Sequence, residues 1–204
     1  MDAVFQIIIL IMSVVIHEVS HGVAALIYGD KTAEYEGRLT LNPLKHLDPI
    51  GSILVPIALY ISSGGSFMFG WAKPVPYNPH NLKPGRWPEA FVALAGPLSN
   101  LCLALIFGLI TRFGATQGLS TGFLHITALI AYINLLLMTF NLVPLPPLDG
   151  SKLLYAIFPQ RLYEMRRFFD RFGLILTVLF IFFVWDYVAP VVDIFFHIIT
   201  GLSA

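Results

Sequence analysis

Two histidines and a glutamate near the N-terminus have the types and spacing of a metal-dependent hydrolytic site. His17, Glu18 and His21 stand in the order His-Glu-x-x-His, inside an apolar stretch from Ala3 to Tyr28. On a helix, residues four apart lie on the same face, so both histidines can point at one metal ion. Glu18 is rotated by about 100° from His17 and can reach a water on that metal.

The apolar setting of these three residues favours a function over chance. Ionisable side chains at membrane depth cost roughly 2.5–3.5 kcal/mol each on insertion scales, so they are retained there for a purpose. The alternative is a chance match, because the motif is short and produces false positives. The flanks, Val4 to Met12 and Val23 to Ile27, would desolvate a chance polar group without compensation. We therefore favour a functional site.

The composition indicates an integral membrane protein. The chain has 204 residues, of which 57% are hydrophobic and 12% charged, and its mean hydropathy is +0.78. This length allows one domain with about four to six hydrophobic elements. The net charge is zero and no basic block suggests a nucleic-acid partner. Cys102 is the single cysteine, so an intrachain disulfide and a cysteine metal cluster are excluded and any metal must be held by His, Asp or Glu.

The elements that must position the motif follow from hydropathy, which predicts an all-α polytopic membrane protein with a small β-rich membrane-associated region. The apolar helices are expected at about 3–28, 90–110, 122–140 and 174–187, with an amphipathic basic helix at 153–171 and a short last or interfacial helix at 190–202. The first of them ends at Gly29-Asp30, a helix stop signal.

The β-rich region is expected between the first two clear spans. Residues 32–41 alternate in polarity, as in a short strand. Residues 70–79 are rich in proline and must be extended, because proline cannot continue a helix. The apolar run 50–61 is only ~18 Å long as a helix, short of the ~30 Å hydrocarbon core. We expect it to be re-entrant or to lie on the membrane surface.

Charge bias predicts the orientation in the membrane, taken to be the cell membrane. One basic group lies between the first helix and Ala90, and a second follows the 122–140 span. If both groups are cytoplasmic, the N-terminus is outside and the spans at 90–110 and 122–140 form a hairpin. Arg112 then falls on the outer side as a minor exception.

A catalytic zinc site typically has three protein ligands and one open position, so a third ligand is needed. Asp149 is the best candidate, because prolines hold the preceding chain extended and Gly150 permits close backbone approach. An even number of spans would also bring it to the side of the membrane where His21 lies. The same aspartate could instead cap the following helix, and local sequence leaves both interpretations open. Asp48, in a proline loop with His46, is the other contender.

Three motifs together resemble the site-2 protease family of intramembrane zinc metalloproteases. They are His17-Glu18-Val19-Ser20-His21, Gly96-Pro97-Leu98-Ser99-Asn100 and Asn141-x-x-Pro144-x-Pro146-x-Leu148-Asp149-Gly150, and the similarity covers about residues 10–155. The resemblance implies that His17, His21 and Asp149 bind one zinc ion and that Glu18 is catalytic. It also implies that Asn100 and Asn141 are polar helpers near the site or the substrate.

The resemblance further implies one domain over residues 1–204, with a catalytic core at about 3–155 and C-terminal helices at 156–204. The chain is similar to the compact subgroup without a PDZ insertion, and its proline-rich edge 73–79 resembles the β-region that presents substrate. The expected function is zinc-dependent endopeptidase activity on membrane-protein segments, with the lipid bilayer and the substrate segment as partners. An intramembrane zinc or ion transporter and an inactive binder of membrane segments remain as alternatives. Neither the substrate nor the oligomeric state follows from the sequence.

Overall fold

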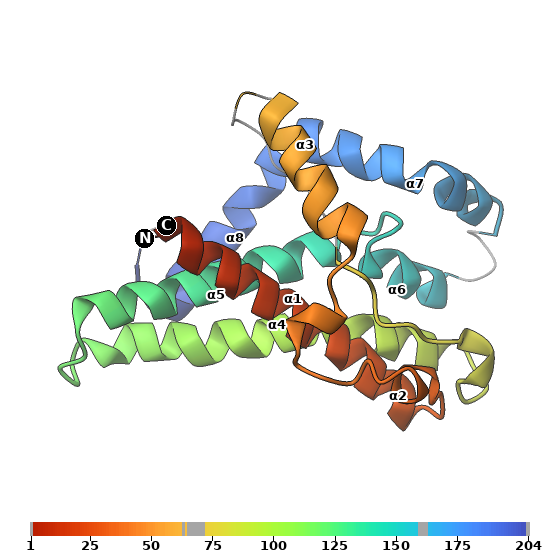
Figure 1. The fold of residues 1–204 in the computed structure, drawn as a ribbon, viewed down its shortest axis with the longest axis horizontal. Helices are drawn as coiled ribbons and strands as arrows, with labels where there is room; N and C mark the ends of the chain where they lie inside the picture. The colour runs from red at the N-terminus through yellow and green to blue at the C-terminus, as the bar shows by residue number, and fades with distance from the viewer. Residues whose placement is uncertain (1, 63, 65–71, 159–162, 203–204) are drawn as a thin grey trace.

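A computed structural model describes residues 2–62, 64, 72–158 and 163–202 (Figure 1). Its elements are α1 (Asp2–Ile27), α2 (Thr32–Tyr35), η1 (Pro43–Lys45), η2 (Pro49–Leu54), α3 (Val55–Ser62), η3 (Pro79–Asn81), α4 (Trp87–Gly114), α5 (Thr121–Asn141), α6 (Asp149–Ile157), α7 (Tyr163–Phe183) and α8 (Trp185–Thr200). Helices α1, α4 and α5 are long and apolar enough to cross a membrane. The apolar parts of α7 and α8 are bent by 71° relative to each other and could form one broken span. The described residues therefore contain three or four candidate spans, as in a multi-pass membrane protein.

The predicted β-rich region is wrong: no strand occurs among the residues that the structure describes. Residues 32–35 form the short helix α2, and Asp30 accepts hydrogen bonds from the Thr32 amide and hydroxyl at its start. Residues 72–78 are extended, as expected, but no strand among the described residues pairs with them. The Lys73 amide donates to the His46 carbonyl, and side chains bind other backbone groups of the segment. The Arg38 guanidinium donates to the carbonyls of Lys73 and Pro74. Gly70 and Trp71, the start of the predicted extended segment, lie outside the described residues.

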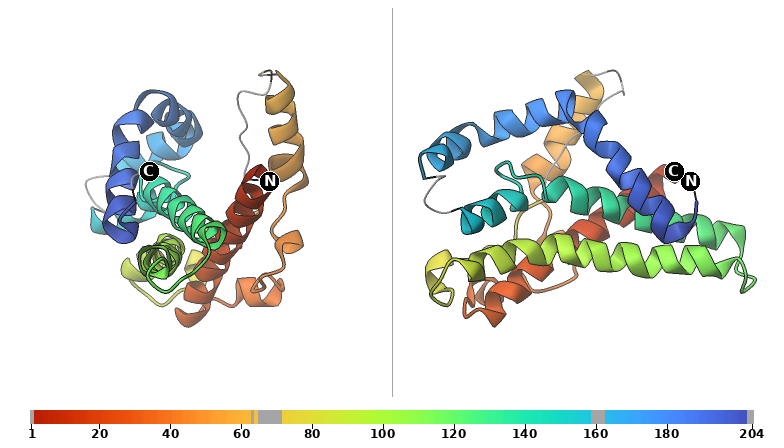
Figure 2. Two further views of the ribbon diagram at one scale, coloured as in Figure 1. Left: turned by 90° about the vertical axis from the view of Figure 1, so that its left-hand side faces the viewer. Right: turned by 180° about the vertical axis from the view of Figure 1, so that it is seen from behind.

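The three long helices form the frame that positions the site. Helix α4 packs against both α1 and α5, and α8 packs across α4 and α5 (Figure 2). Small residues at the contact between α4 and α5 let the backbones approach, as is typical of membrane helices; Ala104 and Ala131 are fully buried there. Val192 and Phe196 of α8 complete this apolar core.

The short apolar run at residues 49–62 lies apart from α7 and α8, the last two helices of the chain (Figure 2). It begins as the π-helix η2 and continues as α3, and with 14 residues from Pro49 to Ser62 it is not among the helices long enough to cross a membrane. Helix α3 lies on the α1 side of the molecule, separated from α7 and α8 (Figure 2, left).

The C-terminal helices differ from the prediction in their bounds. The expected basic helix 153–171 is divided between α6 and α7, and residues 159–162, which include Arg161, lie outside the described part. The break between the last two helices falls at Val184 rather than just before Pro190, which lies inside α8.

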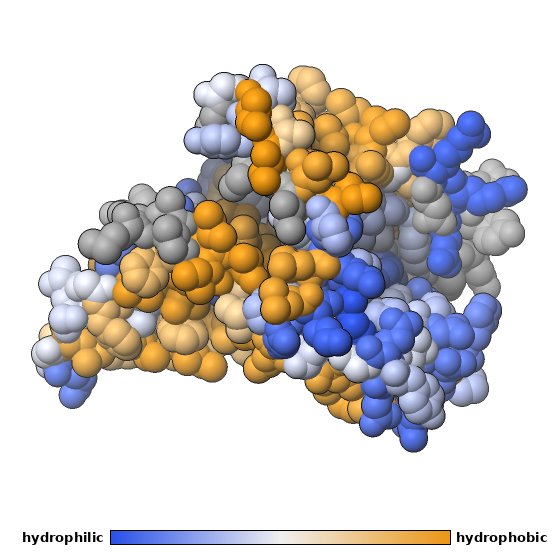
Figure 3. Space-filling view, viewed as in Figure 1, coloured by the Kyte–Doolittle hydropathy of each residue, from blue (hydrophilic) through white to orange (hydrophobic). Residues whose placement is uncertain are grey.

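The chain path brings distant polar segments to one end of the molecule. The C-terminal end of α1, the start of α4 and helix α6 lie together, and the turn between α4 and α5 lies at the opposite end (Figure 1). Hydrophilic residues cover much of the end that carries α2 and α6, while hydrophobic residues cover most of the visible surface of the long helices (Figure 3). Along the chain, the two spans α4 and α5 separate the His-Glu-x-x-His motif from Asp149. The chain crosses and returns, so both lie at the same end.

Candidate metal centre

One face of α1 carries the polar residues of the site. Ser13, His17, His21 and Ala25 recur every four residues and are all buried, as the helical period predicts. On other faces of the helix, Val23 and Ile27 are exposed. The two histidines, 5% and 8% exposed, thus point into the protein from a helix long enough to cross a membrane.

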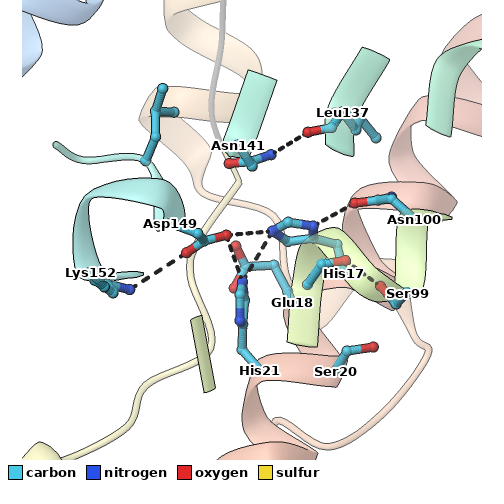
Figure 4. A network of polar contacts seen from close by, with 12 residues as sticks. His17, Glu18, Ser20, His21, Ser99, Asn100, Leu137, Asn141, Asp149 and Lys152 are labelled. Atoms are coloured by element: carbon cyan, nitrogen blue, oxygen red, sulfur yellow. Dashed lines mark hydrogen bonds and ion pairs between the residues drawn. The ribbon is translucent and has the colours of Figure 1, made fainter. Parts of the chain in front are cut away.

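Asp149 meets these histidines from the start of α6. Its Oδ2 lies 3.1 Å from Nε2 of His17 and 3.1 Å from Nε2 of His21, and the two Nε2 atoms are 3.0 Å apart (Figure 4). Across the described residues, these are the three His, Cys, Asp or Glu side chains that could hold one metal ion together. The helix cap is Leu148, so Asp149 does not serve as the N-cap.

The chain before Asp149 explains how the carboxylate reaches α1. The segment after α5 contains Pro144, Pro146 and Pro147, and the Pro146–Pro147 peptide bond is cis. A Cβ atom on Gly150 would overlap the Leu142 carbonyl. Only glycine therefore lets α6 begin directly against the end of α5, as the sequence suggested.

The hydrogen bonds of the two imidazoles leave their Nε2 atoms free for a metal. Nδ1 of His21 lies 2.7 Å from the Val92 carbonyl, and Nδ1 of His17 lies 2.6 Å from Oδ1 of Asn100. A carbonyl oxygen can only accept, so Nδ1 carries the proton and Nε2 carries a lone pair. Partners of this kind orient the histidines of metal sites.

This donor set fits zinc. Two imidazole lone pairs and one carboxylate oxygen lie within 3.1 Å of one another, and such acceptors repel unless a cation lies between them. The spacing is close to that of neighbouring ligands around a tetrahedral zinc ion with bonds of about 2.0–2.2 Å. Three ligands also leave a fourth position, as catalytic zinc sites do.

Gly96 lets the backbone of α4 lie directly against the histidines. A Cβ atom at this position would lie 2.5 Å from Nε2 of both His17 and His21. The glycine of the Gly-Pro-x-x-Asn motif thus permits this close approach, and the asparagine of the same motif, Asn100, bonds to His17. The first and last residues of this motif therefore both lie against His17.

Glu18 lies beside the three ligands and contacts the extended segment 72–78. Its Oε2 accepts a hydrogen bond from the Val75 amide at 2.8 Å, and Val75 is buried. The Val75 side chain packs close to Gly22 of α1, where a Cβ atom would lie 2.8 Å from Val75 Cγ1. The segment is therefore held against the same helix that carries the histidines.

Lys152 is a cation of the site that sequence reasoning missed. Its Nζ lies 3.6 Å from Oδ1 of Asp149, the oxygen turned away from the histidines, and 5.2 Å from the ring centroid of Tyr77. Burial lowers the pKa of Lys152, but Tyr77 and Asp149 outweigh this and raise the pKa, so the side chain is charged. The sequence does contain one indication of this role: Lys152 follows Asp149 by three residues, which places both side chains on the same face of α6.

Other predicted candidates lie elsewhere. Asp48 caps η2 through the Ile50 amide, and the buried His46 bonds to the Thr40 carbonyl. Asn141 lies at the end of α5 and donates to the Leu137 carbonyl of its own helix (Figure 4). Among the described contacts none joins Asn141 to the three ligands. Asn134 was missed although it is a polar residue in an apolar span; it is buried and bonds to Asn100.

Comparisons with known proteins agree with this chemistry. The family model described as "Peptidase family M50" matches residues 110–184, which include Asp149. "Putative zinc metalloprotease YwhC" of Bacillus subtilis is 39% identical over 184 residues, 87% of this chain and 80% of the relative.

Two further relatives are longer than the region they share. "Putative zinc metalloprotease Rip2" of Mycolicibacterium smegmatis is 37% identical over 148 residues, and that of Mycobacterium tuberculosis is 32% identical over 140. Each match covers 69% of this chain and 52% of the relative, so the chain spans about half of their length. No solved structure matches the chain.

Proposed function

This chain belongs to peptidase family M50, the site-2 protease family, and is a zinc metalloprotease; we propose that it cuts peptide bonds in or near the membrane-spanning segments of other membrane proteins. The observation that supports this proposal is the location of the site on a helix that can cross the membrane. Two of the three converging ligand atoms belong to α1, a helix that can cross the membrane, about four turns from its N-terminal end.

The ligands and the space beside them have distinct roles in this proposal. His17, His21 and Asp149 hold one zinc ion, and Gly96 lets α4 lie against the two histidines with no side chain in between. When bound, zinc supplies a Lewis acid that polarises the scissile carbonyl and lowers the pKa of a coordinated water.

Glu18 acts as the general base and then as the general acid. One carboxylate oxygen, Oε2, is held by the Val75 amide, which leaves Oε1 to take a proton from the attacking water. As the carbon–nitrogen bond breaks, the same oxygen returns the proton to the leaving nitrogen. The products are a carboxylic acid and an amine, which exchange a proton to become a carboxylate and an ammonium group, and Glu18 is regenerated.

The extended segment 72–78 is proposed to present the substrate. A membrane helix hides its carbonyls in internal hydrogen bonds, so it must unwind before hydrolysis. An extended chain can pair with the unwound strand through its backbone.

We also propose that the site lies toward the cytoplasm and that the N-terminus lies outside. The segment between α1 and α4 carries six basic residues, and the charge rule assigns such a segment to the cytoplasmic side; they are Lys31, Arg38, Lys45, Lys73, Lys83 and Arg86. The same end of the molecule is hydrophilic (Figure 3). His21 is six residues from the end of α1, hence about 9 Å below that boundary.

Reconstituted protein tests the proposal directly. Proteoliposomes would contain the zinc-loaded protein and a single-span substrate, and mass spectrometry would map the cleaved bond. Cleavage within or beside the apolar stretch is expected. Cleavage confined to the soluble tail of the substrate would contradict intramembrane proteolysis, and zinc flux across the same vesicles would favour a transporter instead.

A further inference from the structure

A line of buried amides joins the backbone of α5 to His17. Nδ2 of Asn134 donates to the Ile130 carbonyl at 2.9 Å and to the Ser13 hydroxyl oxygen at 2.9 Å. Oδ1 of Asn134 accepts from Nδ2 of Asn100 at 2.8 Å, and Oδ1 of Asn100 lies 2.6 Å from Nδ1 of His17. Both asparagines are 0% exposed. The line therefore runs through the protein interior from α5 through α4 to α1.

The chemistry of its first member fixes the direction of the whole line. The Ile130 carbonyl can only accept, so the amide nitrogen of Asn134 must face it and the amide oxygen must face Asn100. Asn100 then has to present its nitrogen to Asn134, which turns its oxygen toward His17. An oxygen at that place requires the proton of His17 on Nδ1 and the lone pair on Nε2.

We propose that Asn134 is a positioning residue that, through Asn100, fixes His17 in the tautomer able to bind zinc. Without Asn134, the Asn100 amide could turn by half a rotation and donate to Nδ1 of His17. The proton of the imidazole would then move to Nε2, which faces His21 and Asp149, and this nitrogen could not bind a metal. This inference rests on the proposed role of His17 as a ligand.

A simpler role for Asn134 is to hold α4 and α5 together, since interhelical hydrogen bonds are common in membrane proteins. The same helix pair offers a matched control. Thr127, two turns before Asn134 on α5, is buried and accepts from the Thr111 hydroxyl of α4 at 2.9 Å. Thr127→Val removes a buried bond between the same two helices, away from the site.

The experiment measures zinc affinity of the full chain in detergent by competition with a chelator. Asn134→Leu should weaken zinc binding roughly 10–100-fold, the usual effect of losing a partner of a ligating histidine, whereas Thr127→Val should leave it unchanged. Adding Asn134→Leu to Asn100→Leu should cause no further loss, because Asn134 acts through Asn100. Unchanged zinc affinity in Asn134→Leu, or an equal loss in Thr127→Val, would overturn the proposal.

A measurement on the wild type covers the case in which Asn134→Leu does not fold. Nitrogen chemical shifts of His17 in zinc-free protein should place the proton on Nδ1, and a proton on Nε2 would contradict the inference. His17→Ala separates this inference from the proposed function. If His17→Ala keeps full zinc affinity, the assigned site is wrong; if it loses zinc while Asn134→Leu does not, only the role of Asn134 is wrong.

Discussion

Oδ2 of Asp149 lies 3.1 Å from Nε2 of His17, although 132 positions separate the two residues in the chain. The hairpin of α4 and α5 closes this distance by leading the chain across the core and back. Because α1 supplies only two of the three ligand atoms, the site exists only when α6 docks against α4 and thereby brings Asp149 to the histidines of α1. Zinc binding should therefore stabilise this docking.

Asp149→Asn removes the anionic ligand with little change of shape. We expect the zinc content of the purified protein to fall from about one ion per chain to near zero, because a catalytic zinc site needs all three protein ligands. Elemental analysis gives the readout. Asp48→Asn is the control, since Asp48 caps η2 and does not belong to the group of three ligands, and it should retain zinc. Full zinc in Asp149→Asn would show that the third ligand is another residue.

Gly96→Ala tests the close approach of α4 to the ligand atoms. The added Cβ would lie 2.5 Å from both Nε2 atoms, so zinc binding and cleavage should be lost together. Gly108→Ala on the same helix is equally crowded, 2.5 Å from Ile199 Cγ2, but far from the histidines in the chain. That variant should bind zinc normally in the chelator competition. Normal zinc affinity in Gly96→Ala would contradict the geometry given for the site.

Arg38→Met tests the anchoring of segment 72–78. The buried guanidinium donates to the carbonyls of Lys73 and Pro74, and hydrogen bonds of this charged kind contribute roughly 1.5–3 kcal/mol. We expect a higher KM for a membrane substrate, with zinc content unchanged. Lys45→Met, at an exposed basic residue of the same region, should have no effect on KM. An unaltered KM in Arg38→Met would argue against substrate presentation by this segment.

Acid should weaken the fold through Asp30. Burial raises the pKa of this carboxyl, but hydrogen bonds from Thr32, Asn81 and Asn78 outweigh burial and lower the pKa. A lowered folded pKa stabilises the fold above the unfolded value of about 3.9, and this contribution is lost as the pH falls through the folded pKa. Thermal unfolding in detergent should show that Asp30→Asn is less stable at neutral pH and loses less stability on acidification below about pH 4. Equal acid sensitivity in both proteins would exclude this role.

The spans and the convergence of the ligands could be predicted because their signals are local. Hydropathy gives the helices α1, α4 and α5, and the period of the helix places His17 and His21 on one face. Two intervening spans then bring Asp149 back to the same end. Neither step requires knowledge of side-chain contacts.

The β-rich region could not be judged in this way, because alternation does not say what binds the backbone. The side chains of Arg38, Glu18 and Asp30 and the His46 carbonyl bind some backbone groups of segment 72–78, and none of them belongs to a strand. Asn134 was missed for a related reason: its polarity was visible in the sequence, but its partners, Ser13 and Asn100, come from two other helices.

The most direct test of the account is to measure zinc content and cleavage of a single-span membrane substrate in wild type and in Glu18→Gln, side by side. Glu34→Gln, at an exposed glutamate of α2, is the control and should match the wild type in both measurements. Glu18→Gln should keep about one zinc ion per chain and lose cleavage, because the amide cannot take the proton of the attacking water. Wild-type cleavage by the zinc-loaded Glu18→Gln protein would contradict the role of Glu18 as the general base.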